Sequence, residues 1–212
     1  DVPLKRIITG INSGGKTSLT IIPPRSEYKF IEVYTILLNG VDINFPDYFF
    51  HTCLTNIFNF VVTENLKNLN KEYILRCLLF LLNKGANPNG NIFNNPMCIL
   101  FEHVEKFFDE YKQFFLDLYY CLYSYGASPF HEIIEINKEK TIYKTTESIT
   151  ETWKTKDKNI YSFLFKLIKT DTEDVLKDYN SNILIEDLRI KYGLPENKNK
   201  GELCECISFI RK

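Results

Sequence analysis

Apolar residues recur with helical spacing along most of the chain, and polar turns interrupt them at three similar points. The apolar runs end in LLNGVDIN at residues 37–44, LLNKGANPN at residues 81–89 and LYSYGASPF at residues 122–130. In each run a glycine stands where a helix needs a left-handed C-cap, and an Asx or Ser residue follows it to stabilise the turn. The pattern predicts helices that end at three equivalent turns.

A second motif precedes each of these turns. It reads TSLT at residues 17–20, TCLT at residues 52–55 and NPMC at residues 95–98. Each copy has a side chain that can cap free N–H groups, then a small residue or proline, a large apolar residue and a small polar one, which is typical of a helix start. The repeating unit is therefore predicted to be a pair of helices followed by a turn.

Together these motifs resemble the ankyrin repeat, with its T-P-L-H start and its L-L-x-x-G-A-D-x-N end. The resemblance covers residues 1–131, with units at about 13–44, 45–89 and 90–130 after a partial unit at 1–12. Gly40, Gly85 and Gly126 stand 45 and 41 residues apart, against a norm of about 33. Extra residues at 61–70 and 102–112 predict longer helices or longer loops within the units. Thr20, Thr55 and Cys98 replace the usual histidine.

The resemblance implies an all-α fold, an ankyrin-type helical solenoid with a helical C-terminal cap. Divergent, elongated units on an Asn-, Ile- and Lys-rich background are similar to ankyrin proteins of large DNA viruses. The family implies a non-enzymatic protein–protein interaction module, here one that binds a host or virion protein. Carried over by position, the candidate partner-binding residues are Asp42, Asn44, Asp47, Asn87, Asn89, Asn91, Ser128 and Phe130. Alternatively, the Asx and Ser side chains in this set only satisfy the hydrogen-bonding groups of the turn backbones.

One stretch matches a nucleotide-binding motif. The residues GINSGGKT at 10–17 fit G-x-x-x-x-G-K-[ST], in which Lys16 would reach the terminal phosphates. A phosphate-binding loop needs a helix of several turns after it, but Pro23 and Pro24 would end that helix early. No later strand ending in an aspartate is available to hold Mg²⁺. We therefore interpret the stretch as a junction between repeats, and a P-loop nucleotide-binding protein as a minor alternative.

Residues 132–180 are predicted to be a helical capping segment. Residues 136–153 are polar and indicate a loop or an exposed helix start. Residues 160–169 predict an amphipathic helix that seals the open end of the stack or, alternatively, binds a partner. Its apolar face comprises Ile160, Phe163, Leu164, Leu167 and Ile168.

Residues 181–212 resemble the SAP-type helix–extension–helix module. The residues LRIKYGLP at 188–195 and GELCECI at 201–207 carry this likeness, and they imply a small domain that binds AT-rich DNA in that family. Lys198 and Lys200 match its basic turn and are the candidate nucleic-acid contacts. Basic residues exceed acidic ones by only one in residues 182–212, which favours structural use or protein docking over strong DNA binding. A nucleic-acid-associated tether remains an alternative function.

Composition and charge exclude several other classes. The 212 residues include 26 Lys and Arg and 27 Asp and Glu, so the formal net charge of −1 argues against a general polyanion binder. The apolar runs are too short to span a bilayer, which needs about 20 residues, and we expect no membrane association. The six cysteines lie mostly in apolar helical runs and are predicted to be buried free thiols in a reducing compartment such as the host cytoplasm or a virion.

Catalytic and metal-binding motifs are not found. His51, His103 and His131 lie far apart in sequence, and Cys204 and Cys206 lack the second ligand pair of a zinc site. We find no serine elbow and no nucleophile with a base at a recognisable spacing. The sequence therefore predicts no enzyme activity, no metal and no cofactor.

Overall fold

Helices make up most of the part of the chain that the structure describes. This structure, a computed structural model, describes Gly15, residues 41–137 and residues 140–169. Its α-helices are α4 (Cys53–Thr63), α5 (Lys71–Asn83), α6 (Pro96–Glu102), α7 (Lys112–Ser124), α8 (Thr146–Lys156) and α9 (Lys158–Lys169). Two 3-10 turns, η1 (Leu66–Asn68) and η2 (Val104–Lys106), and a two-stranded sheet of β1 (Ile133–Asn137) and β2 (Lys140–Lys144) complete the list.

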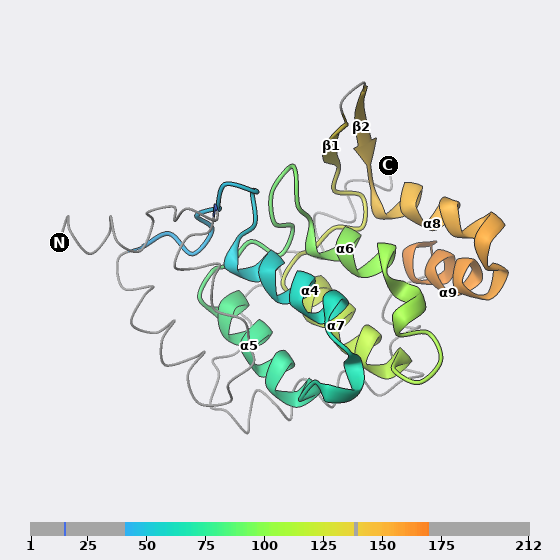
Figure 1. The fold of residues 1–212 in the computed structure, drawn as a ribbon, viewed down its shortest axis with the longest axis horizontal. Helices are drawn as coiled ribbons and strands as arrows, with labels where there is room; N and C mark the ends of the chain where they lie inside the picture. Colours follow the sequence, from blue (N-terminus) through green and yellow to red (C-terminus); the bar gives the residue numbers. More distant parts are fainter. Residues whose placement is uncertain (1–14, 16–40, 138–139, 170–212) are drawn as a thin grey trace.

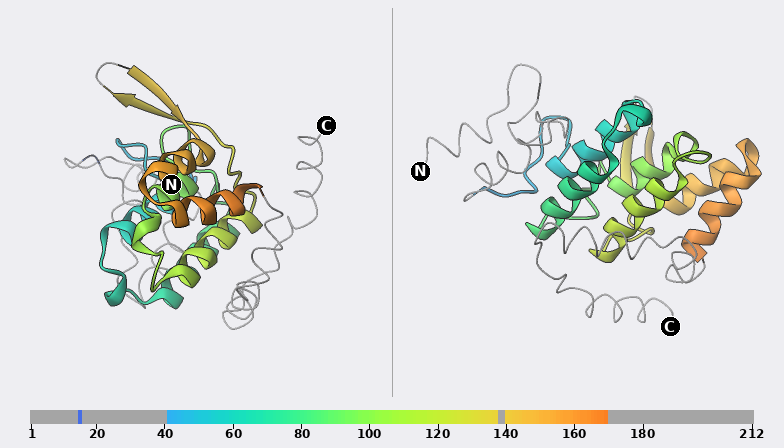
Figure 2. Two further views of the ribbon diagram at one scale, coloured as in Figure 1. Left: turned by 90° about the vertical axis from the view of Figure 1, so that its right-hand side faces the viewer. Right: turned by 90° about the horizontal axis from the view of Figure 1, so that it is seen from below.

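The helices form three consecutive pairs that lie in a row in chain order (Figure 1; Figure 2, right). The first pair is α4 with α5, the second α6 with α7 and the third α8 with α9. Helix α6 packs against both α4 and α8, and α5 packs against α7. Each pair therefore buries apolar side chains against its neighbours, and the buried residues form one continuous core.

The predicted helix starts at residues 52 and 95 are confirmed. The Thr52 hydroxyl accepts a hydrogen bond from the Thr55 N–H (3.3 Å), and the Thr55 hydroxyl accepts one from the Thr52 N–H (2.8 Å), which forms a capping box. The Asn95 Oδ1 atom accepts from the N–H groups of Met97 (2.8 Å) and Cys98 (3.1 Å), and Pro96 stands in the first turn of α6. The motif at residues 17–20 lies outside the described residues.

The predicted left-handed glycines are confirmed at two of the three turns. Gly85 and Gly126 have φ angles of 91° and 99°, which side chains other than glycine rarely adopt. The next N–H group in each turn donates back to a helix carbonyl at 3.0 Å, from Ala86 to Leu81 and from Ala127 to Leu122. Gly40 lies outside the described residues. We call residues 41–46 the first turn, 84–90 the second turn and 125–131 the third turn.

The extra residues within the units form loops with short 3-10 turns. Helix α4 ends at Thr63 and η1 follows, whereas α6 ends at Glu102 and η2 follows. Lys106, which lies in η2, donates from Nζ to the carbonyls of Glu64 (2.8 Å) and Val62. This ammonium group satisfies free carbonyls at the C-terminal end of α4, so one insertion caps the helix of the neighbouring pair.

For the polar stretch at residues 136–153, the prediction of a loop was wrong at β2, which is a strand, whereas the alternative prediction of a helix start is confirmed by α8, which begins at Thr146. Strand β1 pairs antiparallel with β2, with Ile133 opposite Lys144 and Glu135 opposite Ile142. These two strands, called the hairpin below, project from the row of helices (Figure 1). The fold is thus mostly helical, as predicted, with a small sheet that the prediction missed. Helix α8 then begins at Thr146 and buries Trp153, whose Nε1 atom donates to the Phe101 carbonyl at 3.3 Å.

The amphipathic helix predicted at residues 160–169 is confirmed as α9. Ile160, Leu164, Leu167 and Ile168 are buried, and Phe163 contacts the rings of Phe108 and Phe115 in the second pair. The four described cysteines are buried and free, as expected: Cys53, Cys77, Cys98 and Cys121. No helix among the described residues is long and apolar enough to cross a membrane. Residues 1–12, the end of the capping segment and the SAP-like residues 181–212 lie outside the described part.

Candidate functional site

Two asparagines join successive turns by the same pair of hydrogen bonds. The Asn44 side chain donates to the Gly85 carbonyl (3.2 Å) and accepts from the Asn87 N–H (2.7 Å). The Asn89 side chain repeats this geometry, donating to the Gly126 carbonyl (3.2 Å) and accepting from the Ser128 N–H (2.8 Å). Each amide thus uses both its donor and its acceptor to link two turns that lie about forty residues apart.

Three other predicted site residues stabilise the turns from within. The Asp42 side chain accepts from the Asn44 N–H at 2.9 Å, and Asn87 accepts from the Asn89 N–H at 3.1 Å. In the third turn the Ser128 hydroxyl accepts from the Phe130 N–H at 3.2 Å. These are Asx turns and their serine equivalent, which hold the backbone in the shape that the next unit needs.

Two further side chains shape the loops that lead into α4 and α6. In the first tip, residues 47–51, the buried Asp47 accepts from the N–H groups of Phe49 and His51, both at 2.9 Å. In the second tip, residues 91–95, Asn91 accepts from the N–H groups of Phe93 (2.9 Å) and Asn94 (3.0 Å). The two tips therefore depend on the same chemistry at equivalent positions.

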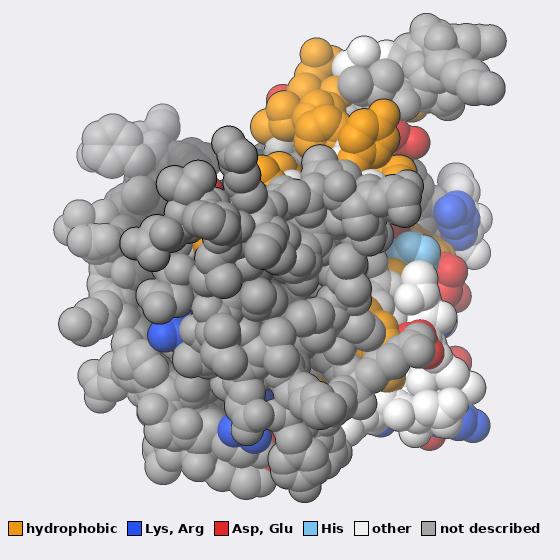
Figure 3. Space-filling view, turned by 60° about the vertical axis from the view of Figure 1, so that its left-hand side comes forward, with side chains coloured by type: hydrophobic (Ala, Val, Ile, Leu, Met, Phe, Trp, Pro, Cys, Tyr) orange, Lys and Arg blue, Asp and Glu red, His pale blue; other side chains and the backbone are white. Residues whose placement is uncertain are grey.

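Because the predicted polar residues bond the backbone of their own chain, apolar side chains form much of the outward surface of these loops. The Phe50 and Phe93 rings stack across the two tips with centroids 4.2 Å apart. Hydrophobic side chains gather at the top of the molecule in Figure 3, on the side from which the hairpin projects. Phe130 is the one predicted site residue among the exposed large apolar side chains. We call the exposed set the tip surface: Tyr48, Phe49, Phe50, Ile92, Phe130, Ile142 and Tyr143.

Sequence reasoning missed the other members of the tip surface, although a signal was present. The residues DYFF at 47–50 and NIF at 91–93 place aromatic or branched apolar residues directly after a turn-forming Asx side chain. A turn has little interior, so large apolar residues there are either exposed or packed on a neighbouring turn. Tyr48 is 69% exposed and Ile92 is 51% exposed, so much of each side chain faces solvent and is not packed on a neighbouring turn.

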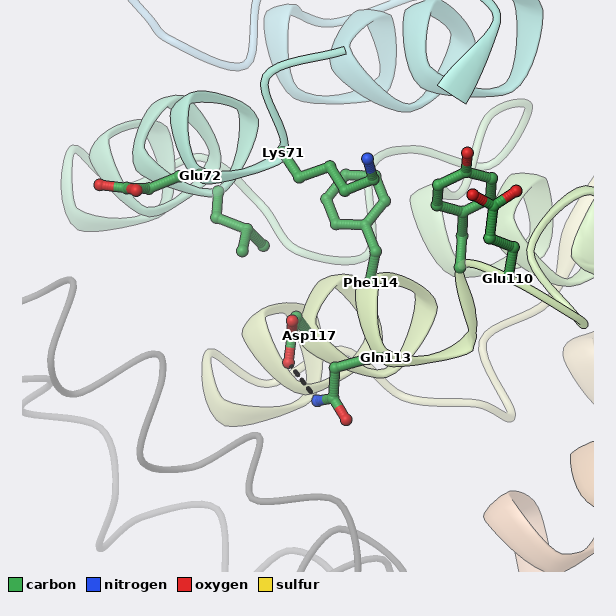
Figure 4. A pocket seen from close by; sticks show the side chains of 8 residues that line it. Lys71, Glu72, Glu110, Gln113, Phe114 and Asp117 are labelled. Carbon is green, nitrogen blue, oxygen red and sulfur yellow. Dashed lines mark hydrogen bonds between the residues drawn. The ribbon is translucent and has the colours of Figure 1, made fainter. Parts of the chain in front are cut away.

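An open cleft lies on another side, between the N-terminal parts of α5 and α7, and has a volume of about 380 Å³ (Figure 4). Lys71 lies 4.6 Å from the centre of the Tyr111 ring, and Gln113 donates to Asp117 at 2.9 Å. The lining carries more carboxylates than cations and includes neither histidine nor cysteine. The cleft therefore presents a mainly acidic lining with two aromatic rings.

Thiol and metal chemistry find no support among the described residues. Burial raises the pKa of Cys53, Cys77 and Cys98 to about 12, and burial also raises that of Cys121. Such thiols stay protonated and are poor nucleophiles at neutral pH. The described part of the chain contains no group of three or more His, Cys, Asp or Glu side chains that could hold a metal ion.

The P-loop-like motif and the basic turn are largely outside the described residues. Lys16, Lys198 and Lys200 are among those not described. Gly15 of the motif has a φ angle of 75°, and its carbonyl accepts from the Tyr48 N–H at 2.9 Å. A Cβ atom on Gly15 would lie 2.7 Å from the Phe49 ring, so a glycine here permits close packing on the first tip. No family model, curated protein or solved structure matches this chain.

Proposed function

We propose that this chain is a divergent ankyrin-type solenoid that acts as a non-enzymatic protein-binding module. The order of the helix pairs, the capped starts at Thr52 and Asn95 and the left-handed Gly85 and Gly126 all support the ankyrin interpretation. The repeated amide links of Asn44 and Asn89 support it further, because stacked units need a contact that recurs from one turn to the next. A host or virion protein is the partner class that the likeness to viral ankyrin proteins favours.

The observation that carries the proposal is the exposure of large apolar side chains on loops whose polar groups are already bonded. Tyr48, Ile92, Phe130 and Tyr143 are each about half exposed or more. Exposed apolar groups that cluster are typical of interaction sites, and aromatic residues are enriched at protein interfaces. Asn91 and Asn94 bond the second tip to the first, and Asn89 bonds the second turn to the third. These bonds hold the loops that bear Tyr48, Ile92 and Phe130, so little conformational entropy is lost when a partner binds there.

The proposal is tested by affinity capture of partners from a candidate host-cell lysate, followed by mass spectrometry. The test variant combines Tyr48→Ser, Ile92→Ser and Phe130→Ser, which remove apolar area from the tip surface without touching the buried core. The matched control is Phe165→Ser on α9, since Phe165 is 41% exposed and lies outside the tip surface. We expect the wild type and Phe165→Ser to capture the same partner proteins, and the triple variant to lose them.

The proposal fails if the triple variant, shown to be folded by its thermal melt, retains the same proteins as the wild type. It also fails if purified wild-type chain binds none of the captured proteins directly, because their recovery would then be indirect. A direct binding assay with each purified candidate distinguishes these cases.

A further inference from the structure

A second cavity lies between α6 and the hairpin, next to the tip surface. It has a volume of about 420 Å³, within the range of about 300–1,000 Å³ that small-ligand sites occupy. Phe50, Phe93 and Ile99 line it from the tips and α6, and Ile133 and Ile134 line it from β1. We call this cavity the hairpin pocket. Its lining can thus accept an apolar group from outside.

One buried polar group beside this cavity lacks a partner. Asn95, which lines the hairpin pocket, is 1% exposed, and its Oδ1 atom is bonded to the N–H groups of Met97 and Cys98. These two bonds fix which end of the amide faces the helix. The Nδ2 atom is buried and has no hydrogen-bond partner among the described residues. A buried donor without a partner is unfavourable. The atom is sealed from solvent here, so a ligand carbonyl would reach and stabilise it only after a shift of the pocket lining.

The pocket carries an excess of negative charge. Lys144 on β2 donates to Glu102 on α6 at 3.1 Å and also pairs with Glu135 on β1. Burial lowers the pKa of Lys144, but the bonds to Glu135 and Glu102 outweigh this effect and raise it overall, so the ammonium group stays charged. One cation faces two carboxylates, and both carboxylate side chains are more than a third exposed. A basic group on a ligand would balance the remaining charge.

We infer that the hairpin pocket binds one large apolar side chain of an extended partner segment that carries a Lys or Arg next to it. The backbone carbonyl of that segment accepts a hydrogen bond from Asn95 Nδ2, and its basic side chain lies near Glu102 and Glu135. This inference rests on the proposed function, because it names the partner chemistry that part of the tip surface would recognise. Phe50 belongs to both the tip surface and the pocket, so a segment anchored in the pocket can continue along the tips.

The probe is a displayed library of random twelve-residue peptides, selected on the full-length chain. We expect the enriched peptides to share a Leu, Phe or Trp with a Lys or Arg beside it. Ile99→Trp fills the pocket from α6, where Ile99 is only partly buried, and should weaken these peptides by about 30-fold, the loss typical of a key interface contact. Enrichment of acidic peptides, equal binding to Ile99→Trp, or no enrichment at all would overturn the inference.

A charge variant provides a second test that does not depend on repacking. Glu102→Gln with Glu135→Gln leaves Lys144 as the remaining charge of the three, so we expect the selected preference to change from basic to acidic neighbours. Glu147→Gln is the matched control, because Glu147 is an exposed carboxylate paired with Lys169 on the third helix pair. The inference is wrong if the double variant and the control select the same peptides as the wild type.

Two other occupants of the hairpin pocket would give different binding results. A synthetic peptide of residues 183–194 that binds more tightly than every selected peptide would make the occupant a segment of this chain. A dimer that forms with rising concentration and disappears in Ile99→Trp would make it a second copy. Either result overturns the inference. If only the inference about the hairpin pocket is wrong, the tip surface still captures partners. If the proposed function is wrong, the triple variant of Tyr48, Ile92 and Phe130 retains the same proteins as the wild type.

Discussion

Two of the junctions between neighbouring loops, one between the tips and one between the second tip and the hairpin, are built differently. The first and second tips are joined by side chains, because Asn91 donates to the Phe50 carbonyl (2.6 Å) and Asn94 donates to the Phe49 carbonyl (3.0 Å). The second tip and the hairpin are joined through the backbone, from the Ile134 N–H to the Ile92 carbonyl (2.6 Å). The hairpin pocket opens beside both junctions, since its lining includes Phe50 of the first tip, Phe93 of the second tip and Ile134 of the hairpin.

The helices behind these junctions also differ. Polar contacts supplement packing between the first and second pairs, as in the bond from the Tyr125 hydroxyl to Asn83 at 2.7 Å. Between the second and third pairs, large aromatic side chains make the contact, with Trp153 bonded to Phe101 and Phe163 packed on Phe115. Polar links also join these two pairs, because the Tyr119 hydroxyl donates to the Leu167 carbonyl at 3.5 Å and the Thr146 hydroxyl donates to the Pro129 carbonyl. The contact with the third pair is therefore distinguished by its buried aromatic rings, not by a lack of polar links. Each prediction below removes one element of this contrast.

The largest effect is expected where apolar burial holds the third pair. Trp153→Ala removes a side chain that is 5% exposed and leaves the Phe101 carbonyl without its indole donor. We expect the free energy of unfolding to fall by about 3–5 kcal/mol, measured by urea denaturation. Phe165→Ala, at an exposed position on α9, should change it by less than about 0.5 kcal/mol. A loss below about 1 kcal/mol for Trp153→Ala would show that the third pair contributes little to the fold.

The next effect concerns the links between turns. Asn89→Ala removes both the bond to the Gly126 carbonyl and the bond from the Ser128 N–H, and the free energy of unfolding should fall by about 2 kcal/mol. Ser128→Ala is the control, because it removes a bond from the exposed Phe130 N–H and should cost about 0.5 kcal/mol. Equal losses for the two variants would mean that the link between turns adds nothing beyond a local turn.

Buried thiols make both regions sensitive to alkaline pH. Burial raises the pKa of Cys53 and Cys77 in the first pair and of Cys98 in the second to about 12, against about 8.5 in an unfolded chain. A folded pKa above the unfolded value means that this stability is complete well below pH 8.5, begins to fall as the pH approaches 8.5 and is lost as the pH rises towards 12. Raising the pH from 7 to 8.5 should lower the free energy of unfolding by roughly 1 kcal/mol for the three thiols.

Urea denaturation at the two pH values, in the presence of a reductant, measures this change. Alkylation followed by mass spectrometry provides the site-specific check, because a folded thiol at pH 8.5 should react far more slowly than the same thiol in urea. Rapid labelling of Cys98 in the folded chain, with Cys53 protected, would show that the second pair opens separately at the hairpin pocket.

Local chemistry explains what could be predicted from the sequence. Caps at Thr52 and Asn95 and left-handed glycines at Gly85 and Gly126 depend on neighbours within a few residues, so the pattern alone locates them. The hairpin was not predicted because the residues KTIYK of β2 are as polar as a loop, although Thr, Ile and Tyr favour strands. Its pairing with β1 and its position beside α6 are decided by contacts distant in sequence.

The candidate site was only half predictable for the same reason. The Asx residues of the turns were located correctly, but a sequence does not say that the Asn89 amide meets a carbonyl at Gly126 rather than a partner. Nor does it say which apolar residues of a turn face outward. Phe50 and Phe93 follow equivalent Asx residues, yet both the contact between their rings and the pocket beside them arise from the packing of loops distant in sequence.

The smallest effect tests the side-chain junction between the tips. Phe50 has a φ angle of 61°, a conformation that costs a non-glycine residue about 1–2 kcal/mol. Asn94 and Asn91 hold the carbonyls of Phe49 and Phe50, and so fix the backbone around this strained residue. Asn94→Ala should lower the free energy of unfolding by only about 0.5 kcal/mol, because the lost bond is exposed.

The same variant should have a clearer effect on local dynamics. Amide hydrogen exchange should become faster in the first tip and remain unchanged in the hairpin, since the Ile134 bond to Ile92 does not involve Asn94. Faster exchange in both places would mean that the loops open as one unit. Unchanged exchange in the first tip would mean that Asp47, which bonds this tip from below, is sufficient to hold it. In either case the contrast between a side-chain junction and a backbone junction would lose its physical basis.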